Sequence, residues 1–230
     1  MDRVTQFDLA TLTTRELNQF LHHQLAESGV ERVEISNPDG KHSIAVGLDV
    51  AVAVDILGHA GYFVAGMNKL AQVTIHGNAG WSVAENIMSG CVRVTGHASQ
   101  CAAASGHGGL VVIEGNASSR CGISMKGCEI VVRGDVGHFA GFMGQAGTLL
   151  VCGDAGPHLG DSLYEAVLYV GGKIDSLGAD AEQQDLKAAD IESISRLLST
   201  AGIEANPGAF KRVASARRLY HWNAAARQEY

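Results

Sequence analysis

Hydrophobic residues recur along this chain every 19 residues, always at the same distance before a glycine. The residues four and two positions before each glycine are aliphatic, whereas the residue between them ranges from charged to aromatic. The aliphatic pairs are Val54 and Ile56, Val73 and Ile75, Val92 and Val94, Val111 and Ile113, Ile130 and Val132, Leu149 and Val151, and Leu168 and Val170. Alternation with a period of two, in residues that favour strands, predicts one short strand per repeat with an inward apolar face.

The glycines predict where each repeat turns a corner, because glycine allows either a positive φ or a close approach between backbones. The seven corner glycines are Gly58, Gly77, Gly96, Gly115, Gly134, Gly153 and Gly172. The residue after each is polar: His59, Asn78, His97, Asn116, Asp135, Asp154 and Lys173. Further columns seven and thirteen positions after the glycine hold small residues. We therefore expect tight corners with a ladder of capping polar side chains.

A unit with a single strand cannot bury its apolar face alone, but stacked copies can. The repeat therefore predicts an all-β solenoid: a single-stranded, right-handed parallel β-helix of about seven 19-residue coils over residues 48–178, with flanking α-helices. Leucine-rich, hexapeptide and calcium-binding nonapeptide repeats fit less well, because their motifs or periods are absent.

The two flanks have helical patterns instead. Residues 1–47 are expected to form a helix and lead-in strands; the amphipathic stretch 13–28 begins with a capping-box pair, Thr13 and Glu16, and is followed by Gly29. Residues 179–230 are expected to form a helical cap and tail, with one helix over 180–201 and a short one near 209–219. Capped ends suit a solenoid, whose terminal coils lack a neighbour.

Composition narrows the classes of function. Apolar residues make up 46% of the 230 residues, charged residues only 18%, and the net charge is −7. An acidic chain is a poor partner for nucleic acid. We see no signal-peptide pattern and no apolar run long enough to span a membrane, and the five cysteines have no disulfide-framework spacing. The chain is therefore expected in the cytoplasm, with reduced thiols.

Two short motifs suggest chemistry but are better explained as corners. Residues 160–163 spell the GDSL string of a hydrolase family, yet the only later histidine, His221, lacks an aspartate two residues before it. The glycine-rich run 106–109 could cradle an anion through backbone N–H groups, but no helix start follows it.

Metal ligation is also disfavoured. Cys101 and Cys121 are the nearest approach to a cysteine pair, and the other cysteines, Cys91, Cys128 and Cys152, lie at other phases of the repeat. His59 and His97 share a column but are two coils apart, and a cation between Asp135 and Asp154 is less plausible than the capping ladder. We assign no catalytic, cofactor-binding or metal-binding residue to this chain.

The glycine columns, with residues 77–90, 106–127 and 152–172 and the closing 215–222, resemble the G-x-x-G-x-x-x-G β-helix domain family. That family includes the C-terminal domain of the glutamate synthase large subunit and one of the subunits of formylmethanofuran dehydrogenase. The resemblance covers about residues 48–220 and is closest for stand-alone glutamate-synthase-like subunits of the N-methylglutamate synthase type. The second glycine of the pattern is replaced by Ser99, Ser118 and Asp175 in three coils, which leaves the choice of family member open.

The resemblance implies a non-catalytic scaffold subunit of a glutamate-synthase-like complex, in particular one that forms N-methylglutamate and ammonia from methylamine and glutamate. It implies a hetero-oligomer with a glutamine-amidotransferase-like subunit and a synthase-like subunit that carries FMN and iron–sulfur centres. The alternatives are a subunit of another glutamate synthase or of a formylmethanofuran-dehydrogenase-like one-carbon complex and, from a different class, a stand-alone β-helix enzyme.

Residues 209–222 are a candidate subunit interface, because they are rich in cations on an otherwise acidic chain. Arg217, Arg218, Tyr220 and Trp222 belong to the residue types that dominate interface hot spots. The alternative is a cap with a solvated basic face.

Overall fold

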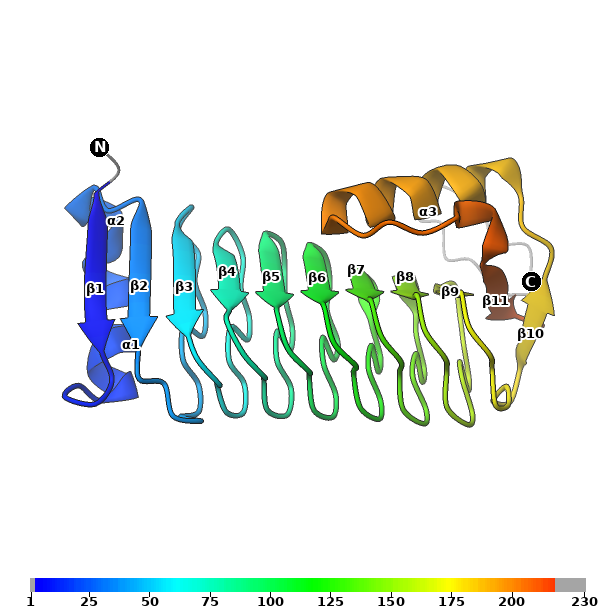
Figure 1. Ribbon diagram of the computed structural model, residues 1–230, viewed down its shortest axis with the longest axis horizontal. Coiled ribbons are helices and arrows are strands. Elements are labelled where there is room, and N and C mark those ends of the chain that lie inside the picture. Colours follow the sequence, from blue (N-terminus) through cyan, green and yellow to red (C-terminus); the bar gives the residue numbers. More distant parts are fainter. Residues whose placement is uncertain (1–2, 218–230) are drawn as a thin grey trace, which may run out of the picture.

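The computed structural model describes residues 3–217 and contains one long stack of parallel strands with a helical element at each end (Figure 1). Its single sheet has the order β1-β2-β3-β4-β5-β6-β7-β8-β9-β11-β10 within those residues. The strands are β1 Val4–Asp8, β2 Arg32–Ser36, β3 Ala53–Leu57, β4 Gln72–Ile75, β5 Cys91–Val94, β6 Leu110–Ile113, β7 Lys126–Val132, β8 Ala146–Val151, β9 Val167–Val170, β10 Ala181–Gln184 and β11 Lys211–Ser215. The helices are α1 Thr14–His23, α2 Leu25–Ser28 and α3 Ala188–Ala201, with a 3-10 turn η1 at Pro207–Ala209.

The register of the sheet confirms a solenoid of about seven turns. Val54 pairs with Val73, Val73 with Val92, and Val92 with Val111, so each strand meets the strand one period later. A second ladder of parallel bridges starts with Ala60 and Ala79 and continues down the corner. The inward aliphatic columns are almost completely buried and form one continuous core along the axis. Stacking, rather than any single coil, buries this surface.

The corner glycines allow the backbones of neighbouring coils to approach closely. A Cβ placed on Gly115 would lie 2.7 Å from the carbonyl oxygen of Gly96 in the coil before it. Among the seven corner glycines, only Gly58 has a positive φ, at 147°. Packing between coils, not backbone freedom, therefore requires glycine at this column.

Left-handed backbone lies elsewhere in the coil, largely at residues that carry a side chain. In the first full coil Phe63, Ala65 and Met67 have φ of 59°, 53° and 56°, and later coils repeat the pattern. Their N–H groups point alternately along the axis: Phe63 donates to Trp81 O of the next coil, and Ala65 donates to Ile44 O of the previous one. Hydrogen bonds in both directions offset the cost of a conformation that such residues rarely adopt.

The C-terminal region corrects two expectations. The helix expected over 180–201 begins only at Ala188, and strand β10 precedes it. The short helix expected near 209–219 is instead η1 followed by strand β11. β11 runs antiparallel between β9 and β10, where Val213 pairs with Leu168 and Gln183. This pairing with distant residues closes the last coil and overrides the local helical pattern.

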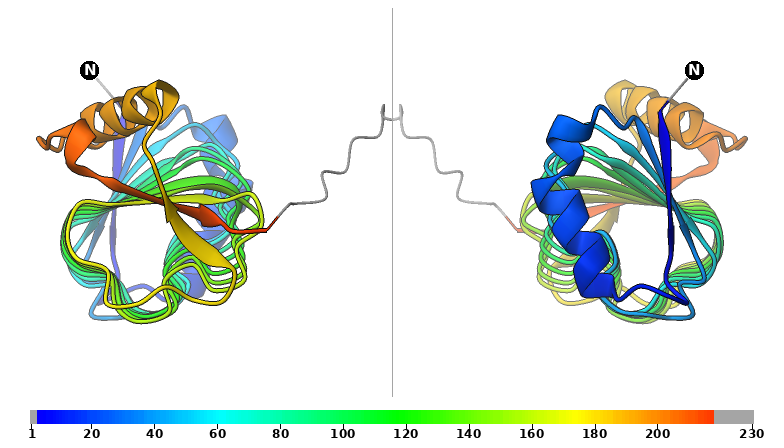
Figure 2. Two further views of the ribbon diagram at one scale, coloured as in Figure 1. Left: turned by 90° about the vertical axis from the view of Figure 1, so that its right-hand side faces the viewer. Right: turned by 90° about the vertical axis from the view of Figure 1, so that its left-hand side faces the viewer.

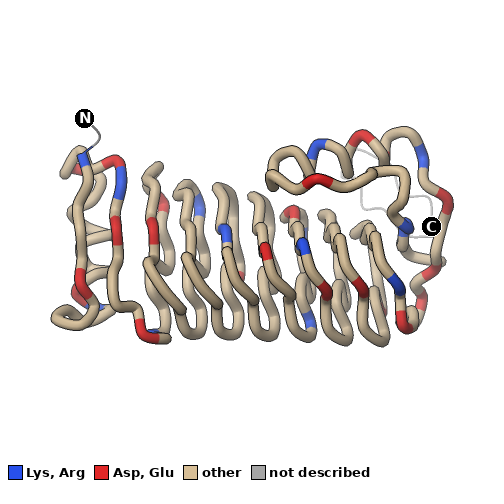
Figure 3. The backbone as a smooth tube through the Cα atoms, in the orientation of Figure 1, with Lys and Arg blue, Asp and Glu red and all other residues tan. Residues whose placement is uncertain are grey.

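Helix α3 turns back over the outer face of β6 to β9, as Figures 1 and 2 show. It forms a second apolar cluster outside the coil, in which Leu197 and Leu198 pack with Val131 and Leu150. Figure 3 shows charged residues scattered along the coils and over both ends, without one dominant block.

The N-terminal helix has the predicted capping box, with Thr13 and Glu16 bonded reciprocally. It buries Leu17 and Leu21 at the open end of the first coil, and the helical stretch breaks at Gln24 before α2 (Figure 2). Within residues 3–217, none of the helices has the length and hydropathy needed to cross a bilayer.

Candidate functional site

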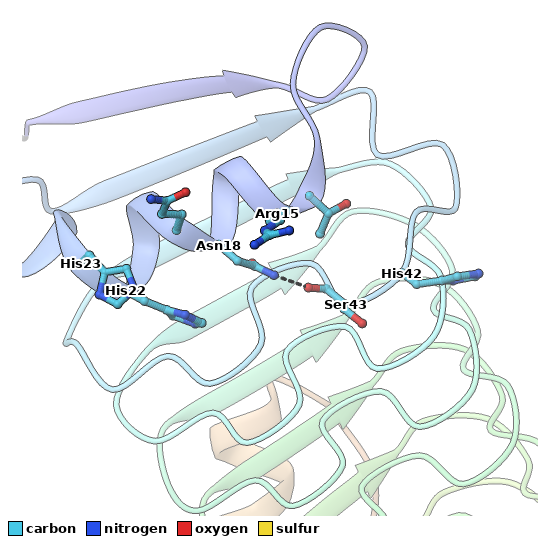
Figure 4. A pocket seen from close by; sticks show the side chains of 8 residues that line it. Arg15, Asn18, His22, His23, His42 and Ser43 are labelled. Atoms are coloured by element: carbon cyan, nitrogen blue, oxygen red, sulfur yellow. Dashed lines mark hydrogen bonds between the residues drawn. The ribbon is translucent and has the colours of Figure 1, made fainter.

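A cleft of about 600 Å³ lies between α1 and the loop that leads into the first coil (Figure 4). Its lining consists of Thr14, Arg15, Asn18, Gln19, His22, His23, His42 and Ser43. The capping box starts α1 at this place, and the buried leucines on its opposite face fix which side of the helix faces the cleft.

Hydrogen bonds hold the two walls of the cleft together. Asn18 Nδ2 donates to Ser43 O at 2.7 Å, and the Ala45 N–H donates to Asn18 Oδ1 at 3.0 Å. One ring nitrogen of His22, Nε2, lies 2.6 Å from Val46 O. The amide of Asn18 thus bonds the loop in both directions, so the cleft is a fixed part of the fold.

The cleft carries positive and imidazole side chains and no acidic one. Arg15, His22 and His23 come from α1, and His42 comes from the loop. Arg15 has no ion-pair partner among residues 3–217. The adjacent Glu16 carboxylate accepts hydrogen bonds from Thr13 N–H and Oγ1, and these bonds lower the pKa of Glu16. On a chain with a net charge of −7, this site suits a carboxylate or another anion.

An aromatic stack continues from the cleft along the coils. The His42 ring stacks on Tyr62 at 4.4 Å, and Tyr62 stacks on Trp81 at 5.5 Å between ring centroids. The Tyr62 N–H also donates to His42 Nδ1 at 2.9 Å. Tyr62 and Trp81 occupy the same phase of successive coils, which places the rings one above the other.

Large apolar side chains are exposed mainly on these first coils. Of the eleven that stand out in residues 3–217, seven fall between positions 57 and 88. They are Leu57, Tyr62, Phe63, Met67, Leu70, Trp81 and Met88. Tyr62 is 43% exposed and Trp81 48%, so the stack is packed along its axis yet open to solvent on its side. Among them Tyr62 and Trp81 are in contact with each other, so the stack is a contiguous part of this exposed apolar surface.

The predicted polar ladder at the corners is confirmed. The Asn78 N–H donates to His59 Nδ1 at 2.9 Å, and the His97 N–H donates to Asn78 Oδ1 at 2.8 Å. The ladder continues through Asn116, Asp135 and Asp154 to the Lys173 N–H. These imidazoles and carboxylates each accept a backbone hydrogen bond from the next coil, which accounts for their presence without a ligand.

The five cysteines are free thiols. Burial raises the pKa of both Cys121 and Cys128 to about 12, and that of Cys152 to about 11. Burial therefore favours the neutral thiol form of these three side chains. Residues 3–217 contain no cluster of three or more His, Cys, Asp or Glu side chains arranged to hold a metal ion.

The two short motifs are parts of corners. Ser162 Oγ donates to Asp161 Oδ1 at 2.8 Å within the same turn, and Asp161 Oδ2 accepts from the Ala179 N–H. In the glycine-rich run, the Gly106 N–H donates to Ala103 O, and the N–H groups of His107 and Gly108 donate to Ile87 O. Those three amides are therefore committed within the fold and do not form a cradle for an anion.

The candidate C-terminal interface lies partly outside the described residues, which is where Arg218, Tyr220 and Trp222 fall. Arg217 pairs with Asp180 at 2.8 Å. Lys211 and Arg212, on β11, bond to Gly172 O and to Asp190 and so belong to the cap. The interface itself stays a prediction.

The cleft and the aromatic stack were missed from the sequence. The signal for the stack was present, since Tyr62 and Trp81 lie 19 residues apart, four residues after successive corner glycines. The cleft had no such signal, because Arg15 and His42 meet only when α1 packs across the end of the first coil.

No family model matches the chain. Protein GlxC of Rhizobium meliloti (strain 1021) is 52% identical to it over 217 residues, which cover 94% of this chain and 95% of that protein.

Proposed function

The chain belongs to the GlxC family, and on that premise we propose that it is the non-catalytic β-helical scaffold subunit of a glutamate-synthase-like complex. Its partners would be a glutamine-amidotransferase-like subunit and a synthase-like subunit that carries FMN and iron–sulfur centres. The more specific proposal is a complex of the N-methylglutamate synthase type, which joins methylamine to glutamate with release of ammonia.

The proposal rests on the contrast between a fully buried core and a surface that still exposes large apolar side chains. The inward columns are buried along the whole rod, whereas large apolar side chains gather in the open on the first two coils. A rod with an exposed apolar surface near one end is suited to holding other chains at fixed positions. The glutamate-synthase assignment rests on the resemblance of the glycine columns, whose segments 77–90 and 106–127 lie within the three coils that begin at Gly77, Gly96 and Gly115.

The test is purification of the native complex through an affinity tag on this chain. We expect mass spectrometry to identify both partner subunits, the eluate to have flavin and iron–sulfur absorption, and methylamine-dependent formation of N-methylglutamate. If the complex instead forms glutamate from glutamine and does not use methylamine, the scaffold role stands but the N-methylglutamate reaction is rejected. A chain that elutes alone, or with proteins of neither kind, would overturn the proposal.

A further inference from the structure

The cleft beside α1 and the aromatic stack form one continuous surface, because His42 belongs to both. His42 lines the cleft with Arg15, and its ring also begins the stack on Tyr62 and Trp81. Figure 4 shows the His42 ring directed away from α1. We call the surface made by Arg15, His22, His42, Tyr62 and Trp81 the N-terminal docking surface.

Resting on the proposed function, we infer that this surface binds a segment of a partner subunit that carries an acidic side chain next to an apolar one. Charge complementarity selects the occupant: the cleft has Arg15 and three histidines and no carboxylate of its own, on an otherwise acidic chain. The acidic group would enter the cleft, and the apolar group would pack on the exposed side of the stack, along the ring edges of Tyr62 and Trp81.

The surface is also prepared in advance for binding. The two hydrogen bonds of Asn18 fix the cleft, and stacking with the Tyr62 N–H bond to His42 fixes the rings. A fixed site loses less conformational entropy on binding than a mobile one. Tyr, Trp and Arg are the residue types that contribute most at interfaces.

The aromatic cluster further along the rod is a weaker candidate. Phe139 stacks on His158 at 4.8 Å and meets Phe142 edge-on, and the Arg120 guanidinium lies 5.9 Å from its ring centre. Phe139 is less exposed than Tyr62 or Trp81, and it does not line the cleft that holds Arg15.

The test uses the full chain and the co-purified partner subunits, with Arg15→Glu and Trp81→Ser as separate variants. The matched controls are Arg133→Glu and Met143→Ser, which change an exposed cation and an exposed apolar residue on later coils. We expect each docking variant to raise the Kd for a partner about tenfold or more, the usual effect at a hot spot. The controls should leave it within about twofold, and circular dichroism should show all four folded.

The outcomes separate the two proposals. Absence of partner subunits from the wild-type preparation would reject the scaffold function. Partners that bind both docking variants as tightly as wild type would reject the docking surface alone. If ultracentrifugation instead shows a self-association that Trp81→Ser abolishes, the occupant is a second copy and the inference is wrong. Displacement of the chain from its partners by millimolar acetate or inorganic phosphate alone would also contradict it, because the apolar contact would then contribute little.

Discussion

The outer face of the sheet is polar over β2 to β5 and apolar over β6 to β9, although the inward face is the same throughout. At one position of the register the four early strands have Glu34, Asp55, Thr74 and Arg93, and the four later strands have Val112, Val131, Leu150 and Tyr169. Helix α3 covers the later set and leaves the early set bare (Figure 1). Stacking of the coils therefore requires apolar residues on the inward face, whereas the polarity of the outward residues depends on whether another element covers the sheet.

Arg93 stands at the border between the two regions. Its guanidinium pairs with Glu114 at 2.7 Å and donates to Ala201 O at the C-terminal end of α3 at 3.0 Å. A cation at a helix C-terminus is favourable, because it meets unpaired carbonyl groups. The bare region has polar contacts of its own: Asp55 pairs with Arg32, and its other carboxylate oxygen lies 2.8 Å from His76 Nε2. One repeat can therefore carry two different outer surfaces without a change in its core.

The largest effect is expected where α3 packs. Leu150→Ala should lower the free energy of unfolding by about 2–5 kcal/mol, because it leaves a cavity in a closed apolar cluster. Thr74→Ala, at the same register position on the bare face, should cost less than about 1 kcal/mol. Urea denaturation of both variants measures this. Equal losses would show that the two outer faces are packed alike.

A corner glycine should behave the same in either region, because the contact that requires it is between backbones. A Cβ on Gly77 would meet the Gly58 carbonyl carbon at 2.8 Å, and one on Gly153 would meet that of Gly134 at 2.7 Å. Each glycine-to-alanine change should cost about 1–3 kcal/mol. A loss at only one of the two, in the same denaturation experiment, would tie the corner to the covering helix and contradict this account.

Asp190 caps α3 and also bonds to Tyr169 of the covered face. Burial opposes its charge, but hydrogen bonds from Tyr169 Oη, the Lys187 N–H and Arg212 outweigh burial and hold the pKa of Asp190 below its usual value. Because the folded pKa is the lower one, this stability is present above the unfolded pKa near about 4 and is lost as the pH falls through the folded pKa.

Asp190→Asn should therefore lower stability at pH 7 by about 1–3 kcal/mol, since it weakens a buried hydrogen-bond network. The variant should also lose less stability than wild type when the pH is lowered from 5 towards the folded pKa. Denaturant midpoints across that pH range test both parts. If both proteins lose the same amount of stability as the pH falls, Asp190 does not contribute to the pH dependence of the C-terminal cap. Tyr169→Phe serves as the matched variant that keeps the carboxylate.

The smallest effect is expected in the corner ladder, which crosses both regions. Asn78→Ala and Asn116→Ala each remove one exposed side-chain acceptor for a backbone N–H of the next coil. The expected loss is about 0.5–1.5 kcal/mol, similar at the two sites, because water can replace the acceptor in part. Thermal unfolding with the two variants side by side would show whether the ladder is uniform.

The repeating half of this molecule could be predicted from the sequence, since the 19-residue spacing fixes which residues point inward. The covering elements could not, because they depend on contacts between distant residues. Val213 becomes part of a strand by pairing with Leu168, and nothing local to residues 209–219 indicates it. One column of outward residues did carry a signal for a covering helix, because it is apolar in four successive strands: Val112, Val131, Leu150 and Tyr169. This signal becomes clear only when the outward column is read separately from the inward columns.

The candidate site also has one part that the repeat predicts, the aromatic stack, and one part that it does not, the cleft. Tyr62 and Trp81 could have been paired from the repeat, since equal phase in successive coils brings rings into contact. Arg15 and His42 come together through the packing of α1 across the coil end, which the helical pattern alone does not orient. The left-handed φ of Phe63 and Met67 was equally hidden, because hydrogen bonds to Trp81 and Glu85 of the next coil, rather than residue type, impose it.

The most direct test of the scaffold account is omission of this chain from the assembled complex. The two partner subunits would be purified with and without it, and light scattering and turnover would be measured on the same samples. The account predicts that without the chain the partners separate and lose the coupled reaction, and that adding the purified chain restores both. Partners that assemble and react fully without it, or a purified chain that catalyses the reaction alone, would contradict the account.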